Sequence, residues 1–325
     1  MGVIYRAERE IFRKIDQASD LGRQTLALRL QSSILETKSF GIVLKLFVIC
    51  VASHLRSAVC LSISPLLHYN QTSTCWASMA LKESEAIVLR TYPLREADLL
   101  VTLFTRAEGK VRGVARSAKK SKRRFGGALE PLTYVRAFYE DRERQELARL
   151  DSCEVLESPL ATEVGYARAV ALAHVAELLD ELLPDREVND AAFRLALSVL
   201  AELRGPDVWM PVTYFELWMT RLMGYLPDLS ECMVCGRTLN GSRAFFHVLT
   251  DGLMCTEDKR LASSEISGES RALAGQMFRA PVERFAGTPW PKKQGSDLRK
   301  FLIQTLQRHI EKKLVTAGML EKISA

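Results

Sequence analysis

The chain has 325 residues, of which 47% are hydrophobic and 26% are charged, and this balance is typical of a folded protein with two or three domains. It excludes a disordered, collagen-like or wholly coiled-coil chain. The formal net charge is +6, so attraction to a polyanion depends on where the basic residues cluster. Seven cysteines are too few for a disulfide scaffold, and we expect a reducing, cytoplasmic environment.

Residues 1–78 differ in character from the rest of the chain. They mix charged segments with a stretch rich in Ser, Cys and His that follows neither helical nor strand periodicity. Their most apolar segment, residues 40–52, is interrupted by Lys45 and falls short of the roughly 20 residues that span a bilayer. It also lies too far into the chain for an ordinary signal peptide. We therefore expect a non-native or disordered extension before Met79, with a genuine accessory tail as the alternative, and no membrane association.

Residues 79–157 have the pattern of a small β-barrel. Short segments of strand-forming residues are separated by turn residues and by one basic loop. Five strands with long loops suggest the oligonucleotide-binding (OB) architecture, although an SH3-like barrel fits the pattern equally well. The predicted strands are residues 85–92, 99–105, 110–116, 132–139 and 147–157.

Residues 158–325 have helical periodicity, with apolar faces opposite charged ones. A loop-rich insert at residues 228–260 contains three cysteines and interrupts the helices. The predicted fold class is therefore α+β and multidomain: an N-terminal five-stranded OB-fold β-barrel followed by an all-α domain with a zinc-ribbon-like insert. The predicted helices are residues 164–183, 189–203, 208–225, 269–280 and 297–315.

The densest charge feature runs from residue 110 to residue 124 and contains eight basic residues and no acidic one. Strand alternation places its first three cations on one face, about 7 Å apart or at multiples of that distance, which suits phosphates along an extended strand. The other five lie in a loop that could close over a nucleic-acid backbone. A solvated basic loop without a ligand is the alternative. The candidate DNA contacts in this run are Lys110, Arg112, Arg116, Lys119, Lys120, Lys122, Arg123 and Arg124.

A second strand sets Tyr134, Arg136 and Phe138 on one face. Aromatic rings that alternate with arginine are typical of surfaces on which unpaired bases stack. We add Tyr134 and Arg136 to the candidate DNA contacts, although an interior position fits Tyr134 equally well. For Phe138 we expect a place in the barrel core.

The insert contains a candidate metal site. Cys232 and Cys235 form a CxxC knuckle, in which two thiolates three positions apart reach one metal ion. Cys255 lies twenty positions beyond Cys235, and Asp258 stands where a fourth cysteine is expected. One structural Zn²⁺ is the predicted cofactor, and a degenerate loop whose cysteines pack as small hydrophobes is the alternative. The candidate ligands are Cys232, Cys235, Cys255 and Asp258, with His247 and Glu257 as spare donors.

No reaction centre is apparent in the sequence. Gly109-Lys110 lacks the upstream glycine and the following Ser or Thr of a phosphate-binding loop, so we expect no nucleotide cofactor. His247 is not followed by the glutamate of the zinc deaminases. His174 and Cys153 fit interior positions. We expect a binding protein rather than an enzyme.

From Met79 almost to its end, the chain resembles the RecO family of bacterial DNA repair and recombination proteins. Residues 85–132 are similar to the family's N-terminal barrel, with a T-x-x-x-G-K stretch, a basic loop and Phe-Gly-Gly-x-Leu. The helix, Gly-Tyr-x-Pro-x-Leu and cysteine knuckle of residues 215–236, followed by DGLMC at 251–255, resemble its second half. Residues 298–314 are similar to its C-terminal helix. Each motif is weak alone, and their order over about 240 residues is specific.

The resemblance implies a non-enzymatic mediator in the bacterial cytoplasm, associated with the nucleoid. Such proteins bind single- and double-stranded DNA and anneal complementary strands. With RecR they help to load RecA onto DNA coated by the single-stranded-DNA-binding protein, whose acidic C-terminal tail they engage. Residues 1–78 have no counterpart in the family, and Asp258 replaces a cysteine of its zinc-bearing members.

The predicted helix 208–225 offers a place for the acidic tail. Tyr214 and Trp218 are four residues apart and supply apolar surface, and Arg221 supplies a cation. The alternative is that both rings pack into the core. For the function as a whole, the alternative is a zinc-ribbon RNA-binding or ribosome-associated accessory protein that uses the same barrel and basic loop.

Overall fold

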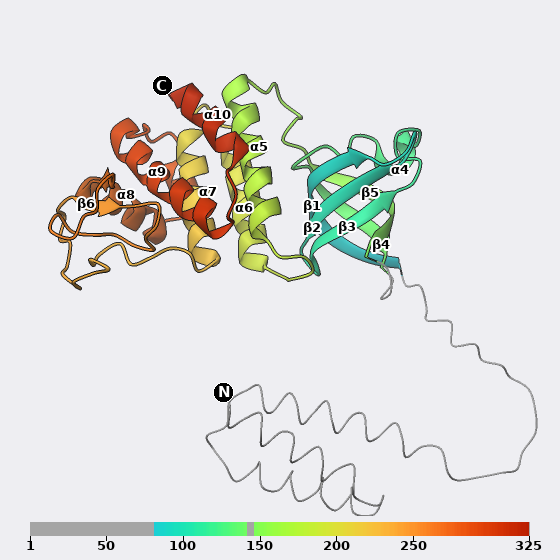
Figure 1. Cartoon of the computed structure of the whole chain (residues 1–325). Coiled ribbons are helices and arrows are strands. Elements are labelled where there is room, and N and C mark those ends of the chain that lie inside the picture. The colour runs from blue at the N-terminus through green and yellow to red at the C-terminus, as the bar shows by residue number, and fades with distance from the viewer. Residues whose placement is uncertain (1–80, 142–145, 325) are drawn as a thin grey trace, which may run out of the picture. The chain divides into compact units, whose positions relative to one another are not determined.

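A computed structural model describes residues 81–141 and 146–324 (Figure 1). These residues belong to one compact unit. The prediction for residues 1–78 lies outside the described residues. Within the described ranges, no helix combines the length and apolarity needed to cross a bilayer.

The first part of this unit is a closed barrel with the strand order β1-β2-β3-β5-β4 (Figure 1). The β3–β5 pair is parallel and the other neighbours are antiparallel. A short helix, α4 (Lys122–Phe125), lies in the connection from β3 to β4. This arrangement is consistent with an OB-fold. The strands are β1 (Leu81–Pro93), β2 (Leu99–Thr105), β3 (Gly109–Ala115), β4 (Tyr134–Glu140) and β5 (Ala148–Glu157).

Alternate side chains of the strands fill the barrel, because successive residues of a strand point to opposite faces. On β4 the interior residues are Val135, Ala137 and Tyr139. The core position predicted for Phe138 is therefore wrong, since Phe138 lies on the opposite, outer face and is half-buried. Cys153 of β5 is buried in the barrel core as predicted, and burial raises the pKa of its thiol to about 12.

The second part is helical, and four of its predicted helices are confirmed within a few residues. Two of them have side-chain caps: Asn189 accepts a hydrogen bond from the backbone N–H of Ala192, and Ser267 accepts one from Ser270. The confirmed helices are α5 (Tyr166–Leu182), α6 (Asp190–Glu202), α7 (Trp209–Leu222) and α8 (Gly268–Arg279). The 3₁₀ helix η1 (Val282–Phe285) follows α8.

The single last helix predicted at residues 297–315 is wrong in its extent. The structure has α9 (Lys292–His309) and a separate α10 (Val315–Ser324). The chain turns between them at Glu311, whose φ is 53°. The Glu177 carboxylate of α5 then accepts hydrogen bonds from the backbone N–H groups of Val315 and Thr316, which begins α10. This cap comes from 138 residues away in the sequence.

A continuous core joins the helices to the outer face of the barrel. Ile87, Leu89 and Phe104 point away from the barrel interior and pack with the buried residues of the helical domain. The ring of Phe193 in α6 lies 5.3 Å from that of Phe104, edge to face. Aromatic pairs in this geometry stabilise packing beyond their buried area. The helical domain therefore covers much of the outer face of β1 and β2.

The insert between α7 and α8 contains the two-stranded antiparallel sheet of β6 (Ala244–Phe246) and β7 (Ser264–Ile266). Phe246 is buried and its ring lies 5.2 Å from that of Phe301 in α9. The insert is therefore anchored to the helical core.

Candidate nucleic-acid interface and metal site

The basic segment, residues 110–124, divides into a part that is bound within the protein and a part that faces solvent. Lys110 is only 7% exposed. Its Nζ donates to the backbone oxygen of Asp180, 2.7 Å away, and lies 3.3 Å from the carboxylate of Asp185. The Arg112 guanidinium also lies 3.3 Å from Asp185. Both side chains thus connect β3 to the end of α5 and the loop after it.

Arg124 also has a structural position. It donates hydrogen bonds to the backbone oxygen of Arg116, at 2.7 Å, and to the hydroxyl of Ser121, at 3.2 Å. Its guanidinium lies 5.1 Å from the centre of the Phe125 ring, and that ring is buried in the barrel core. Arg124 therefore holds the β3–β4 connection in shape.

The remaining five cations of the segment are exposed, and we call them the free cations. None of them forms an ion pair with an acidic residue of the described ranges. They lie in the turn after β3 and at the start of α4. Clustered like charges without counter-charges repel one another and attract an anionic partner. The free cations are Arg116, Lys119, Lys120, Lys122 and Arg123.

The loop between β1 and β2 lies beside the free cations. The backbone N–H of Lys119 donates to the oxygen of Ala97, at 3.2 Å. The N–H of Ser117 donates to the Asp98 carboxylate, at 2.8 Å. The sequence pattern gave no signal for this contact, because the two loops are about twenty residues apart.

The two candidates on β4 have partners within the protein. The half-buried Tyr134 ring lies 6.2 Å from the ring of Phe193, and burial, followed by a hydrogen bond to Glu85, raises the pKa of its hydroxyl. Arg136 is partly exposed and lies 3.3 Å from Glu83 and 3.6 Å from Glu154. Tyr134 thus contributes to the contact between barrel and helices, and the Arg136 charge is already balanced.

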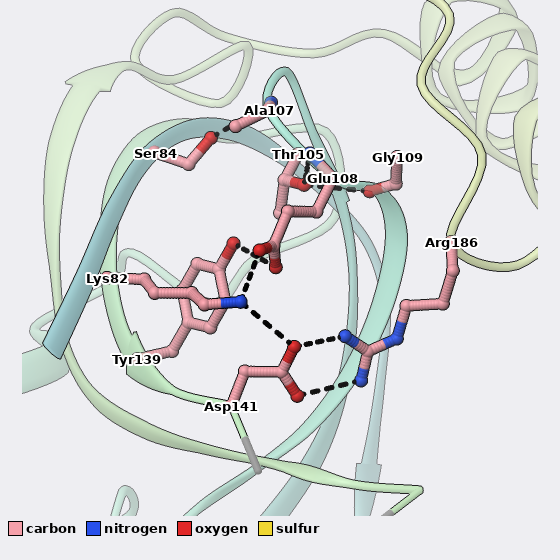
Figure 2. A network of polar contacts seen from close by, with 9 residues as sticks. All are labelled: Lys82, Ser84, Thr105, Ala107, Glu108, Gly109, Tyr139, Asp141 and Arg186. Carbon is pink, nitrogen blue, oxygen red and sulfur yellow. Dashed lines mark hydrogen bonds and ion pairs between the residues drawn. The ribbon is translucent and has the colours of Figure 1, made fainter. Parts of the chain in front are cut away.

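A second polar network lies at the β2–β3 turn of the barrel (Figure 2). The Asp141 carboxylate accepts from Lys82, at 3.3 Å, and from Arg186 of the α5–α6 loop, at 3.0 Å. The hydrogen bond from Arg186 is the largest cause of the lowered pKa of Asp141. Tyr139 donates to Glu108, at 2.9 Å. Because these charges neutralise one another, the network joins the barrel to the helical domain and offers no free charge to a ligand.

The four predicted metal ligands come together in the insert. Donor atoms of Cys232, Cys235, Cys255 and Asp258 all lie within 4.8 Å of one another. The Cys235 and Cys255 sulfurs are 3.9 Å apart, and Asp258 Oδ2 lies 3.2 Å from Cys232 Sγ and 3.0 Å from Cys255 Sγ. A tetrahedral site with Zn–S bonds of about 2.3 Å separates its sulfurs by roughly 3.8 Å. The four donors therefore fit a site for one metal ion.

The protein also supports these donors. Burial opposes ionisation of Cys232, but the backbone N–H groups of Cys235, Cys255 and Val234 outweigh it and lower the pKa of the thiol. Hydrogen bonds from the thiols of Cys235, Cys255 and Cys232 lower the pKa of Asp258.

The two spare donors lie outside the cluster. His247 accepts a hydrogen bond at Nδ1 from the backbone of Leu249, and Glu257 lies 2.8 Å from Arg237. Of these three candidates, only Asp258 lies within the cluster.

The candidate partner residues on α7 lie against the end of α8. Tyr214 is buried and donates to the oxygen of Ala280, at 3.2 Å, and Trp218 donates to the oxygen of Met277, at 3.3 Å. The exposed Arg221 lies over the Trp218 ring, 5.3 Å from its centre. Tyr214 therefore packs in the core, whereas Arg221 is exposed and Trp218 is half-buried.

Two models of known protein families together match almost all of the described chain. Residues 79–159 match the model described as Recombination protein O N terminal, and residues 165–317 match Recombination protein O C terminal. The chain belongs to the RecO family. The DNA repair protein RecO of Koribacter versatilis (strain Ellin345) is 69% identical over 243 residues, which cover 75% of this chain and 99% of that relative.

More distant RecO proteins match with similar coverage. The DNA repair protein RecO of Anaeromyxobacter sp. (strain Fw109-5) is 33% identical over 241 residues, or 73% of this chain and 94% of the relative. The DNA repair protein RecO of Pelotomaculum thermopropionicum is 31% identical over 251 residues, which cover 75% of this chain and 95% of that relative. Membership of the RecO family supports a role in DNA repair and recombination.

Proposed function

We propose that this chain is a non-enzymatic mediator of DNA repair and homologous recombination. In this proposal it binds and anneals DNA and, with RecR, helps to load RecA onto single-stranded DNA coated by the single-stranded-DNA-binding protein. The observation that carries the DNA-binding part is the set of five free cations on the β3–β4 connection. Membership of the RecO family supports the role in repair.

The free cations suit a phosphate backbone because their positive charges have no counter-charge among the residues that the structure describes. Binding to phosphates releases condensed counterions, so affinity falls as salt rises. Contacts of this kind position the protein without reading base edges. We therefore expect binding that is largely independent of sequence. Neutralising phosphates on one strand also lowers its repulsion of a complementary strand, which favours annealing.

We propose that the Cys3Asp cluster holds one structural Zn²⁺. The ion would link the knuckle at Cys232 to the one at Cys255 and so stabilise the insert. Four protein donors would fill the tetrahedral coordination of one Zn²⁺ and leave no open position for a reacting water. The site therefore suits stabilisation rather than hydrolysis.

For the acidic tail of the single-stranded-DNA-binding protein we propose the surface at Arg221 and Trp218. The Arg221 guanidinium lies over the Phe278 ring, 4.6 Å from its centre, so a cation and two aromatic rings adjoin. An acidic peptide with apolar residues needs both. In a pull-down with the tail peptide, Arg221→Ala should weaken capture several-fold. Unchanged capture would move the tail site elsewhere.

A fourfold variant tests the DNA-binding proposal: Lys119→Ala, Lys120→Ala, Lys122→Ala and Arg123→Ala in the full chain. The control removes four exposed cations that already form ion pairs, with the substitutions Arg149→Ala, Arg194→Ala, Arg204→Ala and Arg243→Ala. The net charge changes equally in both proteins.

Binding of a fluorescent oligonucleotide and annealing of complementary strands are then measured at low salt. The fourfold variant should lose most of both activities, and the control should keep them. Equal losses in the two variants would mean that total charge, rather than this segment, attracts DNA. A wild-type protein that prefers structured RNA in competition would favour the RNA-binding alternative.

A further inference from the structure

The outer face of β1, β2 and β3 carries three cross-strand rows of residues. In the first row, Ile87 pairs with Phe104 and Phe104 pairs with Lys110. The two apolar side chains pack into the helical core, and Lys110 is bonded to the end of α5. This row is closed to any external ligand.

The second row continues the contact with the helical domain. Arg90 pairs with Thr102, which pairs with Arg112. The Arg90 guanidinium lies 2.6 Å from the Asp180 carboxylate, and Arg112 lies 3.3 Å from Asp185. OB-folds commonly bind oligonucleotides on strands 2 and 3 and the adjoining loops. In this chain the helical domain occupies most of that face.

The third row remains open. Tyr92 pairs with Leu100, which pairs with Val114. Directly opposed side chains on one face of a sheet lie about 4.5–5.5 Å apart at their Cβ atoms. The Tyr92 side chain is 48% exposed, and Leu100 and Val114 are half-buried. The row thus offers a continuous apolar strip with an aromatic ring at one end.

The open row adjoins the free cations. Arg116 follows Val114 by two residues, so the row leads directly into the basic segment. The loop after Tyr92 is hydrogen-bonded to residues 117 and 119, and it exposes Leu94 and Arg95. An apolar strip beside unpaired cations is complementary to a nucleic-acid strand whose bases and phosphates point to different sides.

The Tyr92 ring is held in place. Its hydroxyl accepts a hydrogen bond from Arg90 Nη1, at 3.0 Å, and Arg90 is itself fixed by Asp180 and by Glu181, 3.2 Å away. Because the ring is positioned before any ligand arrives, stacking on it costs little ordering.

We propose that the open row binds the bases of single-stranded DNA, with Tyr92 stacking on an unpaired base while the phosphates follow the free cations. This inference rests on the proposed function and specifies its substrate as unpaired DNA. Base stacking is indifferent to sequence because every base has an aromatic face. In a duplex the stacked bases are not available to the ring, so the row favours single strands.

The experiment measures the affinity of the full-length protein for two fluorescent DNA strands of 15 nucleotides. One is oligothymidylate, and the other has the same length but abasic central nucleotides. The variants are Tyr92→Ala, Tyr92→Leu and Tyr92→Phe. The control is Tyr166→Ala, because Tyr166 is an exposed tyrosine of α5 outside the row. Melting temperature establishes that each variant is folded.

Tyr92→Ala should weaken binding to oligothymidylate by roughly 5- to 150-fold, the range of one lost stacking contact. On the abasic strand it should have little effect, and the dependence on salt should stay that of the wild type. Tyr92→Phe keeps the ring but loses the hydrogen bond from Arg90, so it should retain most of the binding to oligothymidylate. Tyr166→Ala should bind both strands as the wild type does. If Tyr92→Ala fails to fold, Tyr92→Leu keeps the apolar contact without the ring and should show the same loss on oligothymidylate.

This inference is wrong if folded Tyr92→Ala or Tyr92→Leu binds oligothymidylate within about twofold of the wild type. It is also wrong if these variants lose equal affinity for both strands. The fourfold variant separates that failure from a failure of the proposed function. If the fourfold variant loses binding and the Tyr92 variants do not, the cations bind DNA and the row does not. If neither loses binding, the proposed function itself is wrong.

Discussion

Replacing Arg299 by Met should destabilise the helical domain strongly, because it leaves a buried carboxylate without its main partner. Glu216 of α7 is fully buried. Its carboxylate accepts hydrogen bonds from Arg299 of α9, at 2.9 and 3.1 Å, and its Oε1 lies 2.9 Å from His174 Nε2 of α5. His174 is itself fully buried, as the sequence predicts. Side chains of three helices therefore meet in this one buried polar cluster.

The expected cost is about 3–5 kcal/mol in the free energy of unfolding, since breaking a buried pair from one side leaves an uncompensated charge. The retained contact with His174 favours the lower end of that range. Arg243→Met is the matched control, because Arg243 and its partner Glu265 are both exposed. Arg243→Met should lower the free energy of unfolding by less than about 1 kcal/mol.

The effect should also depend on pH. Burial raises the pKa of Glu216, but the charge of Arg299 and the contact with His174 outweigh it, so the pKa lies below its ordinary value of 4.5. A carboxyl whose pKa is lowered by folding stabilises the protein above its unfolded pKa, and this stabilisation is lost as the pH falls through the folded pKa. The difference between wild type and Arg299→Met should therefore be largest near neutral pH and shrink as the pH falls toward and below 4.5, because the Glu216 carboxylate without Arg299 takes up a proton.

Urea denaturation followed by circular dichroism at several pH values measures the loss in the free energy of unfolding and its dependence on pH. A loss below about 1 kcal/mol at neutral pH would mean that the pair contributes no more than an exposed one. A loss that stayed constant on acidification would show that packing of the Arg299 stem, and not the charge of Glu216, is responsible.

Three further predictions concern the metal, the junction and the N-terminal residues. Protein purified without chelator should contain about one Zn²⁺ per chain, and Asp258→Cys should hold it more tightly in competition with a chelator; less than about 0.2 Zn²⁺ per chain would favour a metal-free loop. Gly109→Ala should lower the melting temperature more than Gly127→Ala. Both glycines have positive φ, but a Cβ at Gly109 would lie 2.0 Å from the oxygen of Glu187, whereas one at Gly127 meets nothing within 4 Å. Equal effects would show that the α5–α6 loop yields freely. A chain that begins at Met79 should keep its melting temperature and its DNA binding, and a loss of either would give residues 1–78 a role.

The elements of the fold could be predicted because their signals are local. Alternation located the strands of the barrel, and the apolar faces located α5 to α8. The boundary between α9 and α10 could not be read, because it depends on Glu177, a cap supplied by another helix. The core position predicted for Phe138 was wrong because alternation defines two faces of a strand without saying which one is interior.

The candidate interface could be predicted only in part. The density of cations identified the basic segment, but the sequence could not separate Lys110 and Arg112 from the free cations. That division depends on Asp180 and Asp185, about seventy residues away, which bind the strand half of the segment. In the candidate metal site, spacing alone allowed several fourth donors, and the structure brings Asp258 within hydrogen-bond distance of the sulfurs of Cys232 and Cys255.

The salt dependence of binding tests most directly whether the free cations neutralise DNA phosphates. The affinity of the wild type and of the fourfold variant for a fluorescent single strand is measured at several salt concentrations. Each phosphate neutralised on a single strand contributes about 0.7 to the slope of log affinity against log salt. If three or four of the removed cations contact phosphates, the slope should flatten by roughly 2–3. A folded fourfold variant that keeps the wild-type slope would contradict this role of the free cations and place the DNA-binding surface elsewhere on the protein.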